Sequence, residues 1–376
     1  MIYKRLFLRR VVVAECRRRC SGEASVVTRV ERGLGLVTLN RPRALNSLDL
    51  DMIRILGPVL RSWEAADSGV RAVMVRGAGG KAFCAGGDIR AITEVPGGDM
   101  QKTFFREEYQ LDHLVGRLSI PYIAVMNGIT MGGGVGISVN GRFRVATERT
   151  VFAMPETAIG LVPDVGGGFF LPRLAGRLGM FLGLTGHRLK GWDCLKAGIA
   201  THAASEDGVE QLQAELVKLT SRGDRVSEEE VQSVLDQVNC SEAENHTFSL
   251  DPNMQDINRI FGAGSVEEIV SLLQKEDSQF ATKALKSIQA ASPTSLKVAF
   301  RQIRAGAELP SLAEVLKMEQ RLVLRCCEDE DFYEGVRATL IDRDSKPSWR
   351  PPTLEAVSEE RLDHYFSNLG PLELQL

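Results

Sequence analysis

Two acidic residues lie close together in an otherwise apolar, glycine-rich segment, MPETAIGLVPDVGGG, at positions 154–168. Glu156 and Asp164 each follow a proline, and the segment contains no basic residue to pair with them. Removing an unpaired carboxylate from water is costly, so such acids are rarely buried for structural reasons alone. The segment is therefore the first candidate for a site whose chemistry uses carboxyl groups.

Two glycine loops precede this segment, AFCAGGD at 82–88 and GITMGGG at 128–134. Each loop follows a predicted strand and precedes a predicted helix, so backbone N–H groups from both loops can point into one cavity. Two converging N–H donors form an oxyanion hole, which stabilises negative charge on a carbonyl oxygen. The glycines of one loop alone are explained equally well by tight turns. Two loops followed by two acids favour a functional site.

Other catalytic patterns are missing from the sequence. The residues around Gly80 and Lys81 lack the first glycine and the Ser/Thr of a phosphate-binding loop, and the Gly-x-Ser-x-Gly sequence of a nucleophile elbow does not occur. GGGVGISVNG has the glycine spacing of a dinucleotide-binding loop, but no ribose-binding acid is evident in its own unit. The five histidines form no i, i+4 pair, and Cys84 has no histidine nearby in the sequence, which favours an inert thiol.

The elements that must position these residues recur in a fixed order. Apolar strands such as RAVMVRG and PYIAVMNG are each followed by a glycine loop and then a helix, which predicts α/β units with loops gathered on one edge. Apolar residues at helical spacing predict a helix in 48–67, capped by Ser47. Long amphipathic helices follow, among them LAEVLKMEQRLVLRCCE. We therefore expect an α/β core at 26–204 and a mainly helical region at 205–376 packed on it.

Composition limits the protein class. The chain has 376 residues, is 25% charged and has a formal charge of −3, which gives no reason to expect a nucleic-acid partner. No apolar run has the roughly 18–20 residues that span a bilayer. Residues 1–22 hold seven Lys/Arg and one acid, interleaved with Leu, Phe and Val, which fits a mitochondrial transit peptide better than a secretory signal, the other reading being a disordered basic tail. Seven cysteines without a C-x-x-C pair predict neither a disulfide framework nor a zinc site.

Longer stretches of the sequence resemble the crotonase superfamily, the enoyl-CoA hydratases and isomerases. KAFCAGGDI, NGITMGGGVG and MPETAIGLVPDVGGG are similar to its fingerprints, and FFREEY, LTGHRLKG and DFYEGVRATLIDRD resemble a hydrolase branch within it. The resemblance extends from about Val26 to the C-terminus. It implies an α/β crotonase fold, a spiral of repeated ββα units with a C-terminal helical layer.

The resemblance also implies roles for individual residues. Members of the superfamily hold the thioester oxygen with two backbone N–H groups, which correspond here to Gly87 and Gly133. The hydratases have two catalytic glutamates. One corresponds to Glu156, whereas the other corresponds to Gly136, which cannot act as an acid or base. Asp164 stands where the hydratases have glycine, so one acid is lost and another is gained at a different point.

This exchange implies thioester hydrolysis, with Glu156 and Asp164 as the expected catalytic acids. Glu156 either attacks the carbonyl carbon to give a mixed anhydride or deprotonates an attacking water. Asp164 is expected to hold a substrate hydroxyl or to orient water. Glu108 matches a substrate-contacting acid of the hydrolase branch, the alternative being an exposed helix charge. A third acid nearby would raise the pKa of one carboxyl.

The implied substrate is 3-hydroxyisobutyryl-CoA, from valine catabolism, with 3-hydroxypropionyl-CoA as a second. No metal or redox cofactor is implied, because CoA enters as part of the substrate. An enoyl-CoA hydratase or isomerase and a non-catalytic acyl-CoA-binding protein are the alternatives. We expect a mitochondrial matrix protein without a membrane or nucleic-acid partner. A homo-oligomer is possible in this superfamily, unless the helical layer covers the surface that would mediate it.

Overall fold

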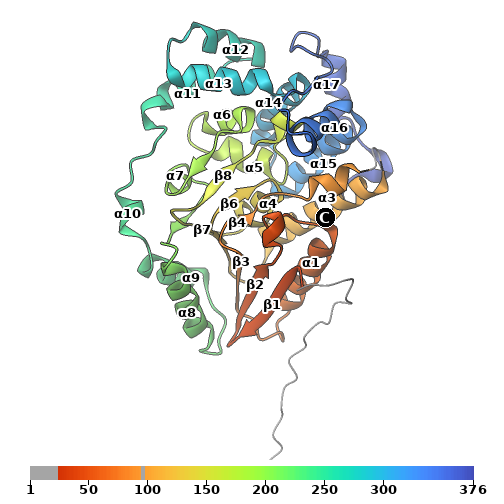
Figure 1. The fold of residues 1–376 in the computed structure, drawn as a ribbon. Coiled ribbons are helices and arrows are strands. Elements are labelled where there is room, and N and C mark those ends of the chain that lie inside the picture. Colours follow the sequence, from red (N-terminus) through yellow and green to blue (C-terminus); the bar gives the residue numbers. More distant parts are fainter. Residues whose placement is uncertain (1–23, 95–97) are drawn as a thin grey trace, which may run out of the picture.

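The computed structural model describes residues 24–94 and 98–376. The predicted transit peptide at 1–22 lies outside the described residues. The described chain forms two sheets enclosed by helices (Figure 1). One sheet has six strands in the order β1-β2-β3-β5-β7-β10, and the other has four in the order β4-β6-β8-β9.

Both sheets are mainly parallel. The exceptions are the antiparallel pairs β1–β2 and β8–β9. The strands of the six-stranded sheet are β1 (Val26–Glu31), β2 (Leu34–Leu39), β3 (Ala72–Gly77), β5 (Tyr122–Met126), β7 (Phe143–Ala146) and β10 (His202–Ala203). The strands of the four-stranded sheet are β4 (Ala82–Cys84), β6 (Ile129–Met131), β8 (Val151–Ala153) and β9 (Leu189–Lys190).

A repeating unit generates the two sheets together. Each of the successive pairs β3-β4, β5-β6 and β7-β8 places its first strand in the larger sheet and its second in the smaller one. Helical structure follows each pair, as the predicted ββα order requires. The sequence places Ala82–Cys84 and Ile129–Met131 within glycine loops, and this part of the prediction is wrong. These short segments become strands because β4 pairs with β6 and β6 pairs with β8, which is tertiary rather than local information.

Helices cover both sheets. The helices before β10 are α1 (Leu50–Glu64), α2 (Ile89–Thr93), α3 (Asp99–Arg117), α4 (Gly133–Val139), α5 (Gly167–Phe170), α6 (Leu178–Thr185) and α7 (Asp193–Lys196). Those after it are α8 (Gly208–Thr220), α9 (Glu228–Gln237), α10 (Ser241–Glu244), α11 (Met254–Ile260), α12 (Val266–Lys275), α13 (Gln279–Ala290), α14 (Pro293–Glu308), α15 (Leu312–Glu328), α16 (Glu330–Val336) and α17 (Glu359–Phe366). A π-helical turn, η5 (Arg337–Ile341), extends α16, and the 3-10 helices are η1 (Pro42–Ala44), η2 (Glu156–Ile159), η3 (Leu171–Arg173), η4 (Asp251–Asn253) and η6 (Gly370–Leu372).

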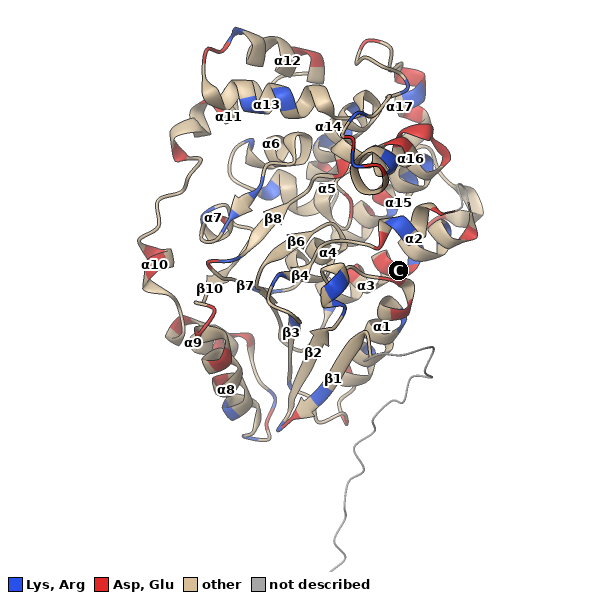
Figure 2. Cartoon of the chain, viewed as in Figure 1, with Lys and Arg blue, Asp and Glu red and all other residues tan. Residues whose placement is uncertain are grey.

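The two largest of the three hydrophobic clusters among the described residues explain this arrangement. The smaller one joins a face of the six-stranded sheet to α8 and α9, through residues such as Met74, Val125 and Leu212. The larger one joins the remaining sheet surfaces to α1, α3 and the helices from α11 onward. Figure 2 shows charged residues mainly on helices and loops, whereas β4, β6 and β8 carry none. Within the described ranges, no helix is long and apolar enough to cross a membrane.

One predicted helix cap is wrong. The helix expected in 48–67 is present as α1, but Asp49 rather than Ser47 caps it by accepting a hydrogen bond from the Met52 amide at 2.8 Å. The Ser47 hydroxyl instead donates to the Ala44 carbonyl at 2.7 Å. Either residue type is a good N-cap, so composition alone does not choose between them.

Candidate active site

The backbone amides of Gly87 and Gly133 lie side by side at the ends of neighbouring strands. Gly87 follows β4, and Gly133 begins α4 shortly after β6, the strand that pairs with β4. A Cβ atom placed on Gly133 would be 3.4 Å from the Gly87 nitrogen. Neither amide donates a hydrogen bond to another group in the described part of the chain. Both donors are therefore available to one carbonyl oxygen, as an oxyanion hole requires.

Glu156 begins η2, directly behind β8, and its carboxyl reaches back to the glycine loops. A Cβ atom on Gly132 would be 3.6 Å from Glu156 Oε1. Glu156 is 4% exposed, and its Oε2 has no hydrogen-bond partner among the described residues. Burial raises the pKa of Glu156 well above its ordinary value, and the charge of Asp164 raises it further. Both effects favour the neutral form of the Glu156 carboxyl over the carboxylate.

Two helices of the C-terminal region hold η2 in place. The amide of Ser292, which caps α14, donates to the Thr157 carbonyl over 3.0 Å. Helix α16 approaches the end of η2 so closely that a Cβ on Gly160 would be 2.2 Å from the Asp331 carbonyl oxygen. Gly160 also has a φ of +73°, so glycine is required there for two reasons. The helical layer thus fixes the element that carries Glu156.

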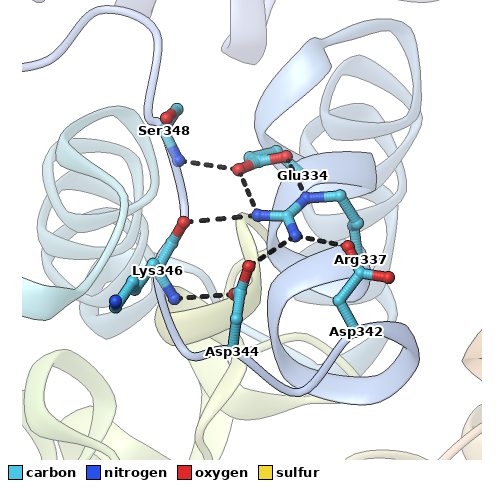
Figure 3. A network of polar contacts seen from close by, with 6 residues as sticks. All are labelled: Glu334, Arg337, Asp342, Asp344, Lys346 and Ser348. Atoms are coloured by element: carbon cyan, nitrogen blue, oxygen red, sulfur yellow. Dashed lines mark hydrogen bonds and ion pairs between the residues drawn. The ribbon is translucent and has the colours of Figure 1, made fainter.

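An ion-pair network around Arg337 fixes the end of α16 (Figure 3). The guanidinium contacts Glu334 at 2.8 Å, and it contacts Asp342 and Asp344 of the following segment at 2.6 and 2.8 Å. The Glu334 carboxylate also accepts a hydrogen bond from the Ser348 amide at 2.8 Å. These contacts fold the segment after η5 back onto α16, the helix that supports η2.

Asp164 lies in the loop that follows η2 and is 3% exposed. Tyr109 of α3 donates a hydrogen bond of 2.7 Å to Asp164 Oδ2. Burial raises the pKa of Asp164 to about 6, and the Tyr109 hydrogen bond limits that rise because it favours the charged carboxylate. The Tyr109 hydroxyl therefore favours the ionised form of Asp164. The sequence gives no signal for Tyr109, because its partner lies 55 residues away.

The loop around Asp164 is strained and is held by a buried glutamate. Val165 has a φ of +52°, a conformation that a β-branched residue rarely adopts. Glu319 of α15 accepts hydrogen bonds of 2.7 Å from the amides of both Gly166 and Gly168. Gln302 donates to the same carboxyl at 3.0 Å. Glu319 thus holds the backbone that presents Asp164, and sequence analysis did not identify it.

Glu108 projects from α3 against α4. It is 2% exposed, so the alternative of an exposed helix charge is wrong. A Cβ on Gly133 would be 2.3 Å from Glu108 Oε1, which has no hydrogen-bond partner among the described residues. Burial raises the pKa of Glu108 well above its ordinary value, and the charge of Asp164 adds to this effect. The Glu108 carboxyl therefore lies beside Gly133, the glycine that approaches the Gly87 amide.

Asp112, one turn further along α3, is a site residue that sequence analysis missed. It is fully buried, and a Cβ on Gly136 would be 2.5 Å from its Oδ1 and 2.7 Å from its Oδ2. The α4 position that lacks a carboxyl is therefore covered by a carboxyl from α3. Burial raises the pKa of Asp112 well above its ordinary value, and negative charge on Glu108 raises it further. The i, i+4 spacing from Glu108 is the signal in the sequence that points to it.

The site as a whole gathers buried acids without a compensating cation. Among the described residues, no Lys or Arg forms an ion pair with Glu108, Asp112, Glu156, Asp164 or Glu319. Burial raises the pKa of Glu319 to about 8 and that of Asp164 to about 6, so Asp164 ionises more readily than Glu319. Two close amide donors together with buried carboxyls whose pKa values differ can stabilise a tetrahedral oxyanion and move a proton during acyl transfer.

Cys84 does not contribute a nucleophile to this site. It is fully buried in β4, and burial raises the pKa of its thiol to about 12. A thiolate is the reactive form of cysteine, so the inert role expected from the sequence agrees with its surroundings.

Comparison with known proteins places this geometry in a family. The family model described as enoyl-CoA hydratase/isomerase matches residues 34–366. The Xenopus laevis protein named "3-hydroxyisobutyryl-CoA hydrolase, mitochondrial" is 53% identical over 91% of this chain and 88% of its own length. The human protein of the same name is 50% identical over the same shares of the two chains. The family resemblance read from the sequence is confirmed.

Solved structures share the fold. A carnitinyl-CoA dehydratase from Mycobacterium thermoresistibile aligns with a TM-score of 0.85 at 35% identity, covering 94% of this chain and 99% of its own. An enoyl-CoA hydratase from Rhodobacter sphaeroides 2.4.1 aligns with a TM-score of 0.84 at 35% identity, covering 94% and 100%. These matches confirm the predicted crotonase fold with its C-terminal helices.

Proposed function

Since this chain belongs to the enoyl-CoA hydratase/isomerase family, we propose that it hydrolyses 3-hydroxyisobutyryl-CoA to the free hydroxy acid and coenzyme A. The curated relatives that share about half of their residues with it carry that activity in their names. The observation that carries the proposal for this chain is the placement of Glu156 against the glycine loop that contains Gly133, with Asp164 close enough for its charge to raise the pKa of Glu156. That placement supplies the parts of a thioester hydrolase.

The oxyanion hole polarises the substrate. The thioester oxygen accepts hydrogen bonds from the Gly87 and Gly133 amides, whose two loops lie side by side. Negative charge develops on this oxygen as the carbonyl carbon becomes tetrahedral, and preorganised donors stabilise that charge more than they stabilise the neutral carbonyl. Removing one such donor from other hydrolases typically costs about 10²–10³ in kcat.

Glu156 and Asp164 act as a pair that holds one proton and one negative charge. The pKa of Asp164 is about 6 and that of Glu156 is raised well above its ordinary value, which favours the charge on Asp164 and the proton on Glu156 in the free protein. Glu156 must lose this proton before it attacks the carbonyl carbon or deprotonates water. Transfer of the proton to Asp164 leaves the net charge of the buried site unchanged. The two groups then titrate as one unit rather than as independent acids.

Two routes start from the Glu156 carboxylate. In one, Glu156 attacks the thioester and forms a mixed anhydride, which water cleaves after the CoA thiolate leaves. In the other, Glu156 removes a proton from the water that attacks the carbonyl carbon. Asp164 carries a proton in both routes and can return it when the cycle closes. Glu108, against Gly133, contacts the acyl group of the substrate.

Enoyl-CoA hydration is the second candidate function, favoured by the likeness to a solved hydratase. Hydration requires a proton at the α-carbon and a water held over the β-carbon. Gly136 has no side chain for either task, and the Asp112 carboxyl occupies the space beside it. Asp164 supports hydrolysis instead, because it provides the second acid at a different point of the site.

A thiol-release assay tests the proposal. The full-length protein is incubated with 3-hydroxyisobutyryl-CoA, 3-hydroxypropionyl-CoA and crotonyl-CoA, while free thiol and the absorbance of the conjugated thioester are followed together. We expect rapid thiol release from the first substrate, slower or comparable release from the second and negligible hydration of crotonyl-CoA. Robust hydration without thiol release would refute the hydrolase assignment, and binding of the substrates without either reaction would indicate a non-catalytic protein.

The setting of the reaction is also part of the proposal. Relatives named as mitochondrial and the basic N-terminal sequence together support import into the mitochondrial matrix with removal of residues near 1–22. We further propose that 26–204 is the catalytic core and that 205–376 fixes η2 and the Asp164 loop. The acyl-CoA substrate is the expected partner, and assembly into a homo-oligomer is tested by sedimentation.

A further inference from the structure

Buried acids in this protein fall into two kinds. The Glu319 carboxyl is saturated, because it accepts bonds from the amides of Gly166 and Gly168 and from Gln302. The other kind has open oxygens. Oε1 of Glu108, Oε2 of Glu156 and both carboxyl oxygens of Asp112 have no hydrogen-bond partner among the described residues. Leaving a buried polar group without a hydrogen-bond partner is destabilising, so these unpaired carboxyls call for a functional reason.

Asp112 is the most open of these acids and lies next to the oxyanion hole. Glu108 and Asp112 are one turn apart on α3, and they lie against Gly133 and Gly136, which are one turn apart on α4. Each acid of α3 therefore faces one glycine of α4, Glu108 against Gly133 and Asp112 against Gly136. Three residues advance a helix by about 4.5 Å. The Asp112 carboxyl, which lies against Gly136, is therefore about that far along the direction of α4 from Gly133, whose amide is proposed to hold the thioester oxygen.

We propose that Asp112 is a specificity-determining residue that binds the 3-hydroxyl of the acyl group, together with Glu108. Three bonds separate the thioester carbonyl carbon from that hydroxyl oxygen, a reach comparable to the one-turn separation of Gly133 and Gly136. An alcohol both donates and accepts a hydrogen bond, and two neighbouring carboxyls satisfy both needs. This role rests on the proposed hydrolase function, because it concerns the acyl group of that substrate.

The protonation of the pair fits this role. Burial raises the pKa of Asp112 well above its ordinary value, and negative charge on nearby acids raises it further, which favours the neutral form, whose O–H group can donate to the substrate oxygen. No described Lys or Arg pairs with Asp112. Gly136 completes the arrangement, since any side chain there would displace the Asp112 carboxyl. Glycine is thus required at position 136 to leave room for the Asp112 carboxyl, in addition to replacing the catalytic glutamate that the hydratases have there.

The test compares 3-hydroxyisobutyryl-CoA with isobutyryl-CoA, which lacks the hydroxyl. The measured quantity is the ratio of their kcat/KM values, because both substrates are cleaved by the same folded fraction and incomplete folding cancels. For the natural protein we expect a ratio on the order of 10² or more. Asp112→Leu, which keeps the shape but cannot hydrogen-bond, and Asp112→Ala, which leaves space, should each lower the ratio at least tenfold. Asp112→Asn keeps a donor and an acceptor and should preserve the ratio within about threefold.

The possible results distinguish a failure of the proposed role of Asp112 from a failure of the proposed hydrolase function. If the ratio of the two kcat/KM values is unchanged in both Asp112→Leu and Asp112→Ala, Asp112 does not bind the 3-hydroxyl. This holds even if the rates with both substrates fall, because an equal fall indicates an effect that does not depend on the hydroxyl, such as the positioning of a water molecule by Asp112. A ratio lost equally in Asp112→Asn would also contradict it. Absence of thiol release by the natural protein from either substrate would instead refute the proposed hydrolase function.

Discussion

Replacing Tyr109 by phenylalanine isolates the charge state of the proposed catalytic pair. The phenol donates a hydrogen bond of 2.7 Å to Asp164, and both side chains are buried. This bond favours the ionised form of Asp164 and lowers its pKa, which nevertheless stands at about 6 because of burial. Phenylalanine retains the ring that packs against Phe105 and removes only the hydroxyl. The pKa of Asp164 must therefore rise in Tyr109→Phe.

The size of the shift follows from the strength of the lost bond. A hydrogen bond to a charged group contributes about 1.5–3 kcal/mol, and about 1.4 kcal/mol corresponds to one pKa unit. We expect the pKa of the pair to rise by about 1–2 units. Activity needs one negative charge on the pair, so it is lost as pH falls through this pKa. The variant should thus be about two- to tenfold less active at pH 7 and recover near pH 9.

The assay is a pH profile of kcat/KM for 3-hydroxyisobutyryl-CoA hydrolysis, with the spontaneous rate subtracted. Tyr122→Phe is the matched control, because its buried hydroxyl donates to the Ile137 carbonyl at 2.7 Å and not to an acid. The control should keep the acid limb of the natural protein. If the acid limb of Tyr109→Phe stays in place while the plateau falls, Asp164 does not carry the essential charge and the pair described here is incorrect.

Three further substitutions test the surrounding structure. Gly136→Ala should lower the free energy of unfolding, measured by urea denaturation, by about 1–3 kcal/mol, because the new Cβ would lie 2.5 Å from the Asp112 carboxyl. Most of this loss should disappear when Asp112 is also replaced by alanine, whereas strictly additive effects of the two substitutions would contradict the packing argument. Gly57→Ala is the control, because a Cβ at that position meets no atom nearer than 3.6 Å. In Glu319→Gln the side chain can no longer accept hydrogen bonds from the amides of both Gly166 and Gly168, so the free energy of unfolding should fall by about 1–3 kcal/mol and kcat at least tenfold. Replacing the exposed Glu328 on the same helix by glutamine should change neither quantity. A fully active Glu319→Gln variant would show that the Asp164 loop does not need these hydrogen bonds. Asp164→Gly should abolish most thiol release without creating crotonyl-CoA hydration, and gain of hydration would mean that Asp164 alone separates this protein from a hydratase.

The sequence predicted the parts of the fold that local patterns encode. Alternation of strands and helices, the glycine loops and the change to long helices after residue 204 follow from periodicity and composition. The three-residue strands Ala82–Cys84 and Ile129–Met131 were missed, because their strand character comes from pairing with each other and with β8. Pairing between segments more than 40 residues apart leaves no local pattern.

The candidate site divides in the same way. Glu156, Asp164 and the glycines stand out because acids among glycines are unusual in one short segment. Asp112 and Glu319 lie in helices rich in charged residues, where residue type alone does not separate a buried acid from a solvated one. Their roles appear only when α3 and α15 pack against α4 and the Asp164 loop. Helical spacing from Glu108 was the available clue for Asp112, whereas no comparable clue existed for Glu319.

The most direct test of the proposed chemistry is the rate of CoA release from 3-hydroxyisobutyryl-CoA by Glu156→Gln. The amide keeps the size of the side chain but can neither attack the thioester nor remove a proton from water at neutral pH. With thermal stability unchanged, kcat/KM should fall by at least about 10³-fold relative to the natural protein. Turnover within tenfold of the natural rate by a folded Glu156→Gln variant would place the chemistry on another residue and contradict the account.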